Sequence, residues 1–127
     1  MTLHANVSPY RRFPGTAAEA MNTYAEILGV EVEIMPTPDG AVMHAELRKD
    51  GRAFLLASDT FPGEEHVAGT DTPLAITGDD ESEIRGYWDR LADGGEILQP
   101  LVAAPWGAIF GQLQDRFGTR WMFNIAA

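Results

Sequence analysis

Hydrophobic residues recur at helical spacing between residues 16 and 29, which predicts a helix in the first half of the chain. Thr16 and Glu19 have the spacing of a capping box at its start, and Gly29 is a suitable stop. Around this helix, hydrophobic and polar residues alternate with the period of half-buried strands, at residues 6–13, 30–34, 41–47 and 52–59. The first half therefore predicts the order βαβββ.

The same order is found again in the second half. Acidic residues from Asp80 can cap a second amphipathic helix, which Gly94 and Gly95 end. Strand-like segments flank it at residues 73–78, 96–98 (closed by Pro100), 107–114 and 119–125. We therefore predict an α+β fold of two tandem βαβββ modules: module one at about 1–60, a loop-like linker at about 60–72, and module two at about 73–127.

Size and charge limit the function. A chain of 127 residues is most simply one domain, and its net charge of −10 argues against nucleic acid or a membrane surface as partner. The chain has no cysteine, which excludes disulfides and thiolate chemistry. No segment resembles a signal peptide or a membrane span, so a cytoplasmic location is the default expectation.

Duplicated βαβββ modules resemble the vicinal oxygen chelate superfamily of glyoxalase I, bleomycin-resistance proteins, extradiol dioxygenases and fosfomycin-resistance enzymes. Several strings are similar to its PhnB-like branch, often labelled "3-demethylubiquinone 3-methyltransferase-like": SPYRRFPGTAAEAMNTYAEILG (8–29), VMHAEL (42–47), LLASDTFPG (55–63), LADGGEI (91–97), PWGAIFG (105–111) and DRFGTRWMFNI (115–125). The resemblance implies cupped mixed sheets and a homodimer. It does not support a methyltransferase, because no glycine-rich nucleotide loop follows a strand.

The resemblance also indicates where a metal would be held. Metal-dependent relatives place His, Gln or Glu on the first and last strands of each module. The corresponding residues here are about Pro9, Leu56 or Ala57, Pro73 or Leu74, and Met122, or, with a slipped register, Ser8, Ser58, Thr72 and Asn124. None offers an imidazole or carboxylate, so we expect no metal and no other cofactor.

His44 is the candidate catalytic residue. By alternation it shares a sheet face with Val42 and Glu46, opposite Met43, Ala45 and Leu47. On the face that lines the cavity in the resembled fold, it can act as a general base. The alternative is a histidine hydrogen-bonded within the sheet or exposed at its rim.

Two residues of the fourth strand are candidate ligand contacts. Ser58 alternates with Leu56 and Phe54, so Phe54 and Ser58 can face the cavity. A nucleophilic role for Ser58 is not favoured, because no histidine lies at a fixed short spacing from it. Asp59 can cap the turn that follows.

The second module carries a surplus of aromatic residues. Trp106, Phe110, Trp121 and Phe123 can wall a cavity for a planar or apolar ligand. Trp121 and Phe123 alternate onto one face, which either lines the cavity or packs on the helix. The alternative for the whole set is core, with a dimer interface around Trp106.

The sequence therefore predicts a metal-free protein that binds a small molecule in an aromatic-lined cavity, as bleomycin-resistance proteins do. An alternative is an enzyme of the lyase, isomerase or group-transfer type that uses His44 or an unrecognised divalent metal. A third possibility is a partner domain that only dimerises.

Overall fold

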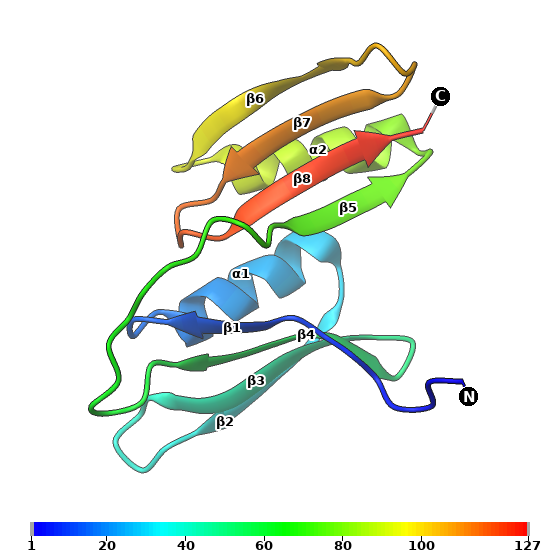
Figure 1. Ribbon diagram of the computed structural model, residues 1–127. Helices are drawn as coiled ribbons and strands as arrows, with labels where there is room; N and C mark the ends of the chain where they lie inside the picture. The colour runs from blue at the N-terminus through cyan, green and yellow to red at the C-terminus, as the bar shows by residue number, and fades with distance from the viewer. Residues whose placement is uncertain (1, 127) are drawn as a thin grey trace. The chain divides into compact units, whose positions relative to one another are not determined.

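The computed structural model describes residues 2–126. The chain divides into two compact units, which we call unit 1 (up to His66) and unit 2 (from Val67). The boundary lies inside the expected linker. Each unit is a four-stranded mixed sheet with one helix against one of its faces, as Figure 1 shows. The predicted α+β fold of two βαβββ modules is confirmed.

Unit 1 pairs its strands in the order β1-β4-β3-β2, with β1 parallel to β4 and the other pairs antiparallel. Helix α1 packs against β2, β3 and β4, and leaves the opposite sheet face uncovered by any helix of unit 1. The elements of this unit are β1 (Tyr10–Phe13), α1 (Ala17–Leu28), β2 (Glu31–Pro36), β3 (Val42–Lys49) and β4 (Arg52–Asp59).

Unit 2 repeats this arrangement in the order β5-β8-β7-β6, with β5 parallel to β8. Helix α2 packs against β5, β7 and β8. The elements are β5 (Leu74–Gly78), α2 (Glu81–Ala92), β6 (Glu96–Ala103), β7 (Ile109–Gln114) and β8 (Arg120–Ile125). In both units we call the face away from the helix the open face.

The core of each unit lies between the helix and the sheet. In unit 1, Tyr24 of α1 and Leu47 of β3 are fully buried. In unit 2, the ring of Trp88 on α2 meets the ring of Phe123 on β8 edge to face, with centroids 5.0 Å apart. Hydrophobic residues at helical and strand periods thus converge on one layer in each unit, which is what the predicted amphipathic patterns require.

The start of α1 differs from the prediction. Thr16 makes no side-chain capping hydrogen bond, so the predicted capping box is wrong. Instead, Asp59 at the end of β4 accepts a hydrogen bond from the backbone N–H of Ala17. Asp59 was predicted to cap the turn after it, so its role at the start of α1 is a second difference. Two other predicted caps are confirmed: Asp80 accepts from the Glu83 N–H at the start of α2, and Gly29 ends α1 in the left-handed conformation at φ 68°.

Two predicted strand ranges also differ. The first strand begins at Tyr10 rather than at residue 6, and Pro9 before it contributes only its carbonyl, which accepts from the Leu56 N–H. Strand β6 continues through Pro100, where we expected it to stop. This proline is tolerated because β6 is an edge strand and its pairing with β7 is irregular between Gln99 and Val102.

Within residues 2–126, neither helix is long and apolar enough to span a bilayer.

Candidate functional site

A β-bulge in β3 fixes which side chains reach the open face of unit 1. Met35 pairs with His44 and Pro36 pairs with Val42, which leaves Met43 without a partner. Val42 is therefore buried, while Met43 is exposed. The predicted alternation is wrong at this end of the strand: Val42 lies with the helix-facing residues, not with His44.

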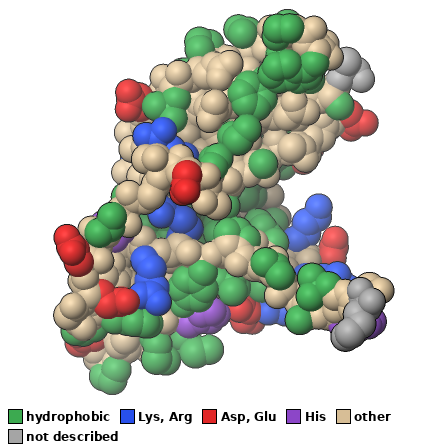
Figure 2. Space-filling view, in the orientation of Figure 1, with side chains coloured by type: hydrophobic (Ala, Val, Ile, Leu, Met, Phe, Trp, Pro, Cys, Tyr) green, Lys and Arg blue, Asp and Glu red, His purple; other side chains and the backbone are tan. Residues whose placement is uncertain are grey.

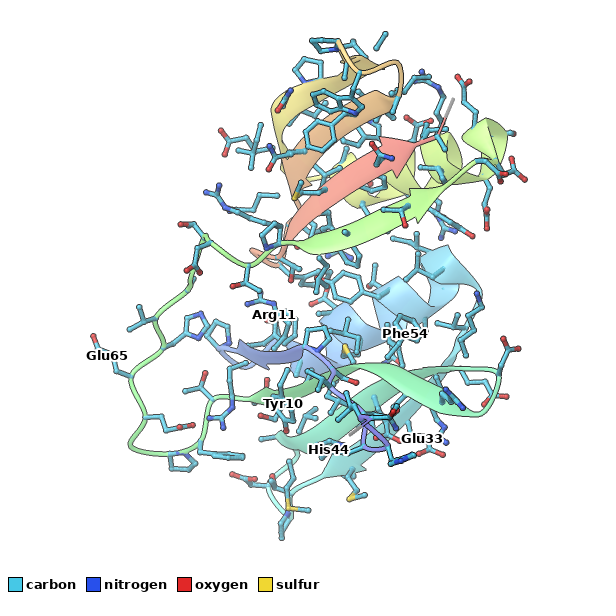
Figure 3. All side chains as sticks on the ribbon, turned by 45° about the vertical axis from the view of Figure 1, so that its right-hand side comes forward. Tyr10, Arg11, Glu33, His44, Phe54 and Glu65 are labelled. Carbon is cyan, nitrogen blue, oxygen red and sulfur yellow. The ribbon has the colours of Figure 1, made fainter. Side chains whose placement is uncertain are left out.

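Beyond the bulge, a row of paired residues crosses the open face, and all but one of them are polar. Tyr10 on β1 pairs with Leu56 on β4, Leu56 pairs with Glu46 on β3, and Glu46 pairs with Glu33 on β2. His44 lies two residues before Glu46, and alternation gives it the same face. Figure 3 shows Tyr10, His44 and Glu33 grouped on the sheet of unit 1.

Four side chains of this face form a continuous hydrogen-bonded chain. The Tyr10 hydroxyl lies 3.2 Å from His44 Nδ1, and His44 Nε2 lies 3.2 Å from Glu46 Oε2. Arg48 donates from one terminal nitrogen to Glu46 Oε1 and from the other to the carbonyl of Gly51. The sheet thus joins β1 to β3 through a phenol, an imidazole, a carboxylate and a guanidinium.

The pKa of Glu46 is lowered from its ordinary value. The main cause is the hydrogen bond from His44, followed by the hydrogen bond from Arg48, and these outweigh the opposing effect of burial. Glu46 is therefore a carboxylate at neutral pH, and a carboxylate can only accept hydrogen bonds. This fixes the direction of the hydrogen bonds at Glu46, which accepts from His44 and from Arg48.

Two hollows open beside this chain. One, of about 600 Å³, is lined by Glu33, Ile34, Met35, His44 and Glu46. The other, of about 490 Å³, lies beside the segment that precedes β1 and is also lined by Glu46. Because Glu46 borders both, its carboxylate is the central polar group of the open face.

The other site residues predicted in unit 1 lie apart from this chain. Ser58 is fully buried, and its hydroxyl donates to the backbone carbonyl of Asp59 at 3.0 Å. Phe54 has no partner in the pairing of β3 with β4, because Leu47 pairs with Leu55 and the next pair is at Ala53. The Phe54 side chain is 37% exposed.

The four aromatic residues of unit 2 separate into two pairs. Trp106 and Phe110 meet edge to face with centroids 5.7 Å apart, and Trp106 is 65% exposed. Trp121 and Phe123 are buried on the helix side of the sheet, where Trp121 Nε1 donates to the Asp115 carboxylate at 2.8 Å. The sequence did not decide whether Trp121 and Phe123 line the cavity or pack on the helix, and in the structure they pack on the helix side.

The open face of unit 2 carries amides where that of unit 1 carries titratable groups. Ala75 pairs with Met122, and Met122 pairs with Gln112. Gln112 donates to the Gln99 side chain at 3.2 Å. The titratable hydrogen-bonded chain is therefore a feature of unit 1.

Comparison with known proteins identifies the family. The sequence matches the Glyoxalase/Bleomycin resistance protein/Dioxygenase superfamily over residues 6–123. The chain belongs to this superfamily. The predicted resemblance is thereby confirmed.

The relatives include PhnB-like proteins, as expected. Protein YjdN of Escherichia coli is 28% identical, with 94% of each chain aligned. The solved structure of protein PA1353 from Pseudomonas aeruginosa is 32% identical with a TM-score of 0.87, covering 95% of this chain and 97% of that one. The PhnB protein from Bacillus cereus is 28% identical with a TM-score of 0.84, covering 96% and 100%.

The positions at which the resemblance implied metal ligands do not fit a divalent ion. Leu56 is the open-face residue of β4 beside Tyr10, and Met122 is the matching residue of β8 beside Ala75. A leucine provides no donor atom, and a thioether is a poor ligand for Zn²⁺ or Mn²⁺. Nowhere in residues 2–126 do three or more His, Asp or Glu side chains gather as a metal site would need.

His44 was predicted as a site residue, but Tyr10 and Arg48 of its hydrogen-bonded chain, and Glu33 in the same hollow, were not. Tyr10 lies 34 residues before His44, so no short motif joins the two. Glu33 and Glu46 meet because β2 and β3 form a hairpin, and their equal distance from its turn was a signal that the sequence already contained. Arg12 of β1 lies outside this chain of hydrogen bonds and pairs with Glu64.

Proposed function

We propose that this PhnB-like member of the superfamily is a binding protein whose ligand is a small organic molecule held at the open face of unit 1. One observation carries the proposal: the hollow of about 600 Å³ is lined by His44 and Glu46, whose hydrogen bonds hold them in place. Small-molecule sites combine a concave surface with a few polar groups in fixed positions. The exposed Trp106 and its neighbour Phe110 provide a second, aromatic contact surface in unit 2.

The proposal is tested by adding a panel of small aromatic compounds to ¹⁵N-labelled protein. We expect saturable shifts in the backbone amide signals of β2 and β3. Tryptophan fluorescence reports separately on unit 2, because Trp88, Trp106 and Trp121 all lie there. A broad panel that moves neither the amide signals nor the fluorescence would refute the binding function.

We also propose that binding needs no metal. Support comes from Leu56 and Met122, which stand where the resemblance implied ligands. Elemental analysis of protein purified without chelator should find far less than one divalent ion per chain. A tightly held stoichiometric ion would overturn this part of the proposal and favour an enzyme.

A second candidate is a lyase- or isomerase-type enzyme with His44 as its base. The observation that favours it is the chain from Tyr10 through His44 to Glu46, in which a carboxylate orients an imidazole next to a hydroxyl. Replacing His44 by Ala should then abolish turnover of any ligand found in the panel. A ligand that binds the wild type without chemical change supports the binding function instead.

The two units are proposed to act as one glyoxalase-like domain, in a cytoplasmic homodimer. Support for self-association is the exposed apolar surface of unit 2, where Ile97, Val102 and Trp106 are each more than half exposed; Figure 2 shows hydrophobic side chains over this part of the sheet. Sedimentation should give twice the 13.9 kDa chain mass. Val102→Asp should weaken the dimer, while a monomeric wild type would contradict it.

A further inference from the structure

The hydrogen bonds of the Tyr10–His44–Glu46–Arg48 chain are made to other groups of the protein and not to solvent. Because Glu46 accepts at Oε2, His44 Nε2 must carry the proton. In a neutral imidazole His44 Nδ1 is then unprotonated, so it accepts from the Tyr10 hydroxyl. Both terminal nitrogens of Arg48 donate, one to Glu46 and one to the carbonyl of Gly51. Of the side chains that line the hollow, His44 is the one with an N–H donor in this chain, and that donor is engaged by Glu46. Arg48, which keeps further N–H groups, does not line the hollow.

Acceptors, in contrast, remain available. Glu33 is exposed, and its carboxylate makes no hydrogen bond or ion pair with another residue in 2–126. The Tyr10 oxygen keeps its lone pairs when its proton is given to His44. A ligand that fits this face must therefore bring the donors itself.

Charge favours the same class of ligand. Glu33 and Glu46 place two carboxylates on the hollow, and Arg48 is the cation that the structure pairs with one of them. The whole chain carries a net charge of −10, so its field repels anions and attracts cations. An anionic ligand would meet the unpaired Glu33 without a donor to offset the repulsion.

An apolar surface lies beside these carboxylates. Met35 lines the same hollow and is 55% exposed. Its flexible thioether side chain adapts to ligands of different shape and contacts aromatic rings favourably. The hollow thus combines an unpaired carboxylate with a soft apolar wall.

From these features we infer that the hollow lined by Glu33, Met35, His44 and Glu46 binds organic cations. The ligand has an ammonium or amidinium group that donates to Glu33, and an apolar part that contacts Met35. This inference rests on the proposed binding function and specifies its ligand class.

Measuring the tautomer of His44 tests the donor assignment without a ligand. In protein labelled with ¹⁵N-histidine, His44→Gln identifies the signals of this ring among the three histidines of the chain. We expect Nε2 to have the chemical shift of a protonated nitrogen and Nδ1 that of an acceptor. The opposite tautomer would overturn the donor assignment and with it the inference.

Three probes of similar shape test the ligand class: phenethylammonium, phenethyl alcohol and hydrocinnamate. We expect phenethylammonium to shift the backbone amides of Glu33, His44 and Glu46 in a saturable way, with at least about tenfold higher affinity than the alcohol. Hydrocinnamate, the anion, should not bind there. Binding of the alcohol or the anion as tightly as the ammonium would refute the cation inference but leave the binding function standing.

A pair of matched variants locates the site. Glu33→Gln removes the charge but keeps the shape, and should weaken phenethylammonium binding by about fivefold or more. Glu96→Gln makes the same change on an exposed strand of unit 2 and should alter affinity by less than about twofold. Equal effects of the two changes would show only general charge attraction and would refute the site. If no probe shifts any amide of β2 or β3, the cation inference fails, while the binding function is decided by the broad panel described above.

Discussion

Asp59, the last residue of β4, accepts a hydrogen bond at Oδ1 from the backbone N–H of Ala17, the first residue of α1, at 2.9 Å. Its other oxygen accepts from the Val42 N–H at the start of β3, also at 2.9 Å. One buried carboxylate therefore joins the beginnings of two elements to the end of a third. Asp59→Ala leaves two buried N–H groups without partners, and we expect it to lower the free energy of unfolding by about 2–4 kcal/mol, measured by urea unfolding.

The matched control is Asp79→Ala, an exposed aspartate that precedes α2. It should change the free energy of unfolding by no more than about 0.5 kcal/mol. If both variants are equally stable, Asp59 is not the cap that holds these elements together.

The same pair of residues shows what the sequence could and could not predict. The range of α1 follows from local spacing, and it agrees with the structure to within a residue or two at each end. Its cap does not, because Asp59 lies 42 residues away from Ala17 along the chain. Local patterns identified Thr16 as the cap, but a tertiary contact satisfies the helix end instead.

The candidate site was predicted in the same uneven way. Alternation placed His44 and Glu46 together on one face, and the structure confirms their contact. The bulge at Met43 escaped prediction because Ala41, Val42 and Met43 are all apolar, so no change of polarity marks the place where the alternation shifts. For Trp121 and Phe123, alternation gave a shared face but could not say which one, since that depends on the packing of α2.

Gly111 on β7 lies close to the Trp88 ring of α2 and to the backbone of β6. A side chain at this position should therefore lower the stability of the fold. A Cβ there would lie 2.9 Å from Cα of Leu101 and 2.9 Å from the Trp88 ring. Gly111→Ala should lower the free energy of unfolding by about 1–3 kcal/mol, because backbone atoms cannot easily give way. Thermal unfolding followed by circular dichroism measures the change.

Gly86 provides a control of opposite sign. It lies inside α2, and a Cβ there meets no atom within 4 Å. Gly86→Ala should raise the free energy of unfolding by about 0.5–1 kcal/mol through helix propensity alone. A stabilising Gly111→Ala would show that β7 and α2 are less closely packed than this contact implies.

Trp121 and Asp115 form a buried pair at the turn between β7 and β8. Asp115 Oδ2 accepts from the Trp121 indole, while Oδ1 accepts from the Thr119 N–H at 3.0 Å. Trp121→Phe keeps an aromatic ring but leaves one carboxylate oxygen without this donor, and should cost about 1–3 kcal/mol in urea unfolding. Asp115→Ala should cost at least as much, because it also removes the turn hydrogen bond. A neutral Trp121→Phe would mean that water replaces the indole at Asp115.

Glu46 gives a prediction with a definite pH dependence. Its pKa in the folded protein lies below the ordinary value of 4.5, chiefly because His44 donates a hydrogen bond to it. A group whose pKa is lowered by folding stabilises the protein fully above its unfolded pKa, and this stabilisation is lost as pH falls towards the folded pKa. Wild type should therefore exceed Glu46→Gln in free energy of unfolding at about pH 7, and the excess should shrink as the pH falls below about 4.5.

Urea unfolding of both proteins at about pH 7 and about pH 3.5 measures this difference. Glu96→Gln, on an exposed strand of unit 2, should stay within about 0.5 kcal/mol of wild type at both values. The difference in free energy of unfolding between wild type and Glu46→Gln could instead stay constant or grow in acid. That result would mean that folding does not lower the pKa of Glu46. The hydrogen bonds from His44 and Arg48 would then not be the reason that Glu46 stays ionised, and the donor assignment on this face would lose its basis.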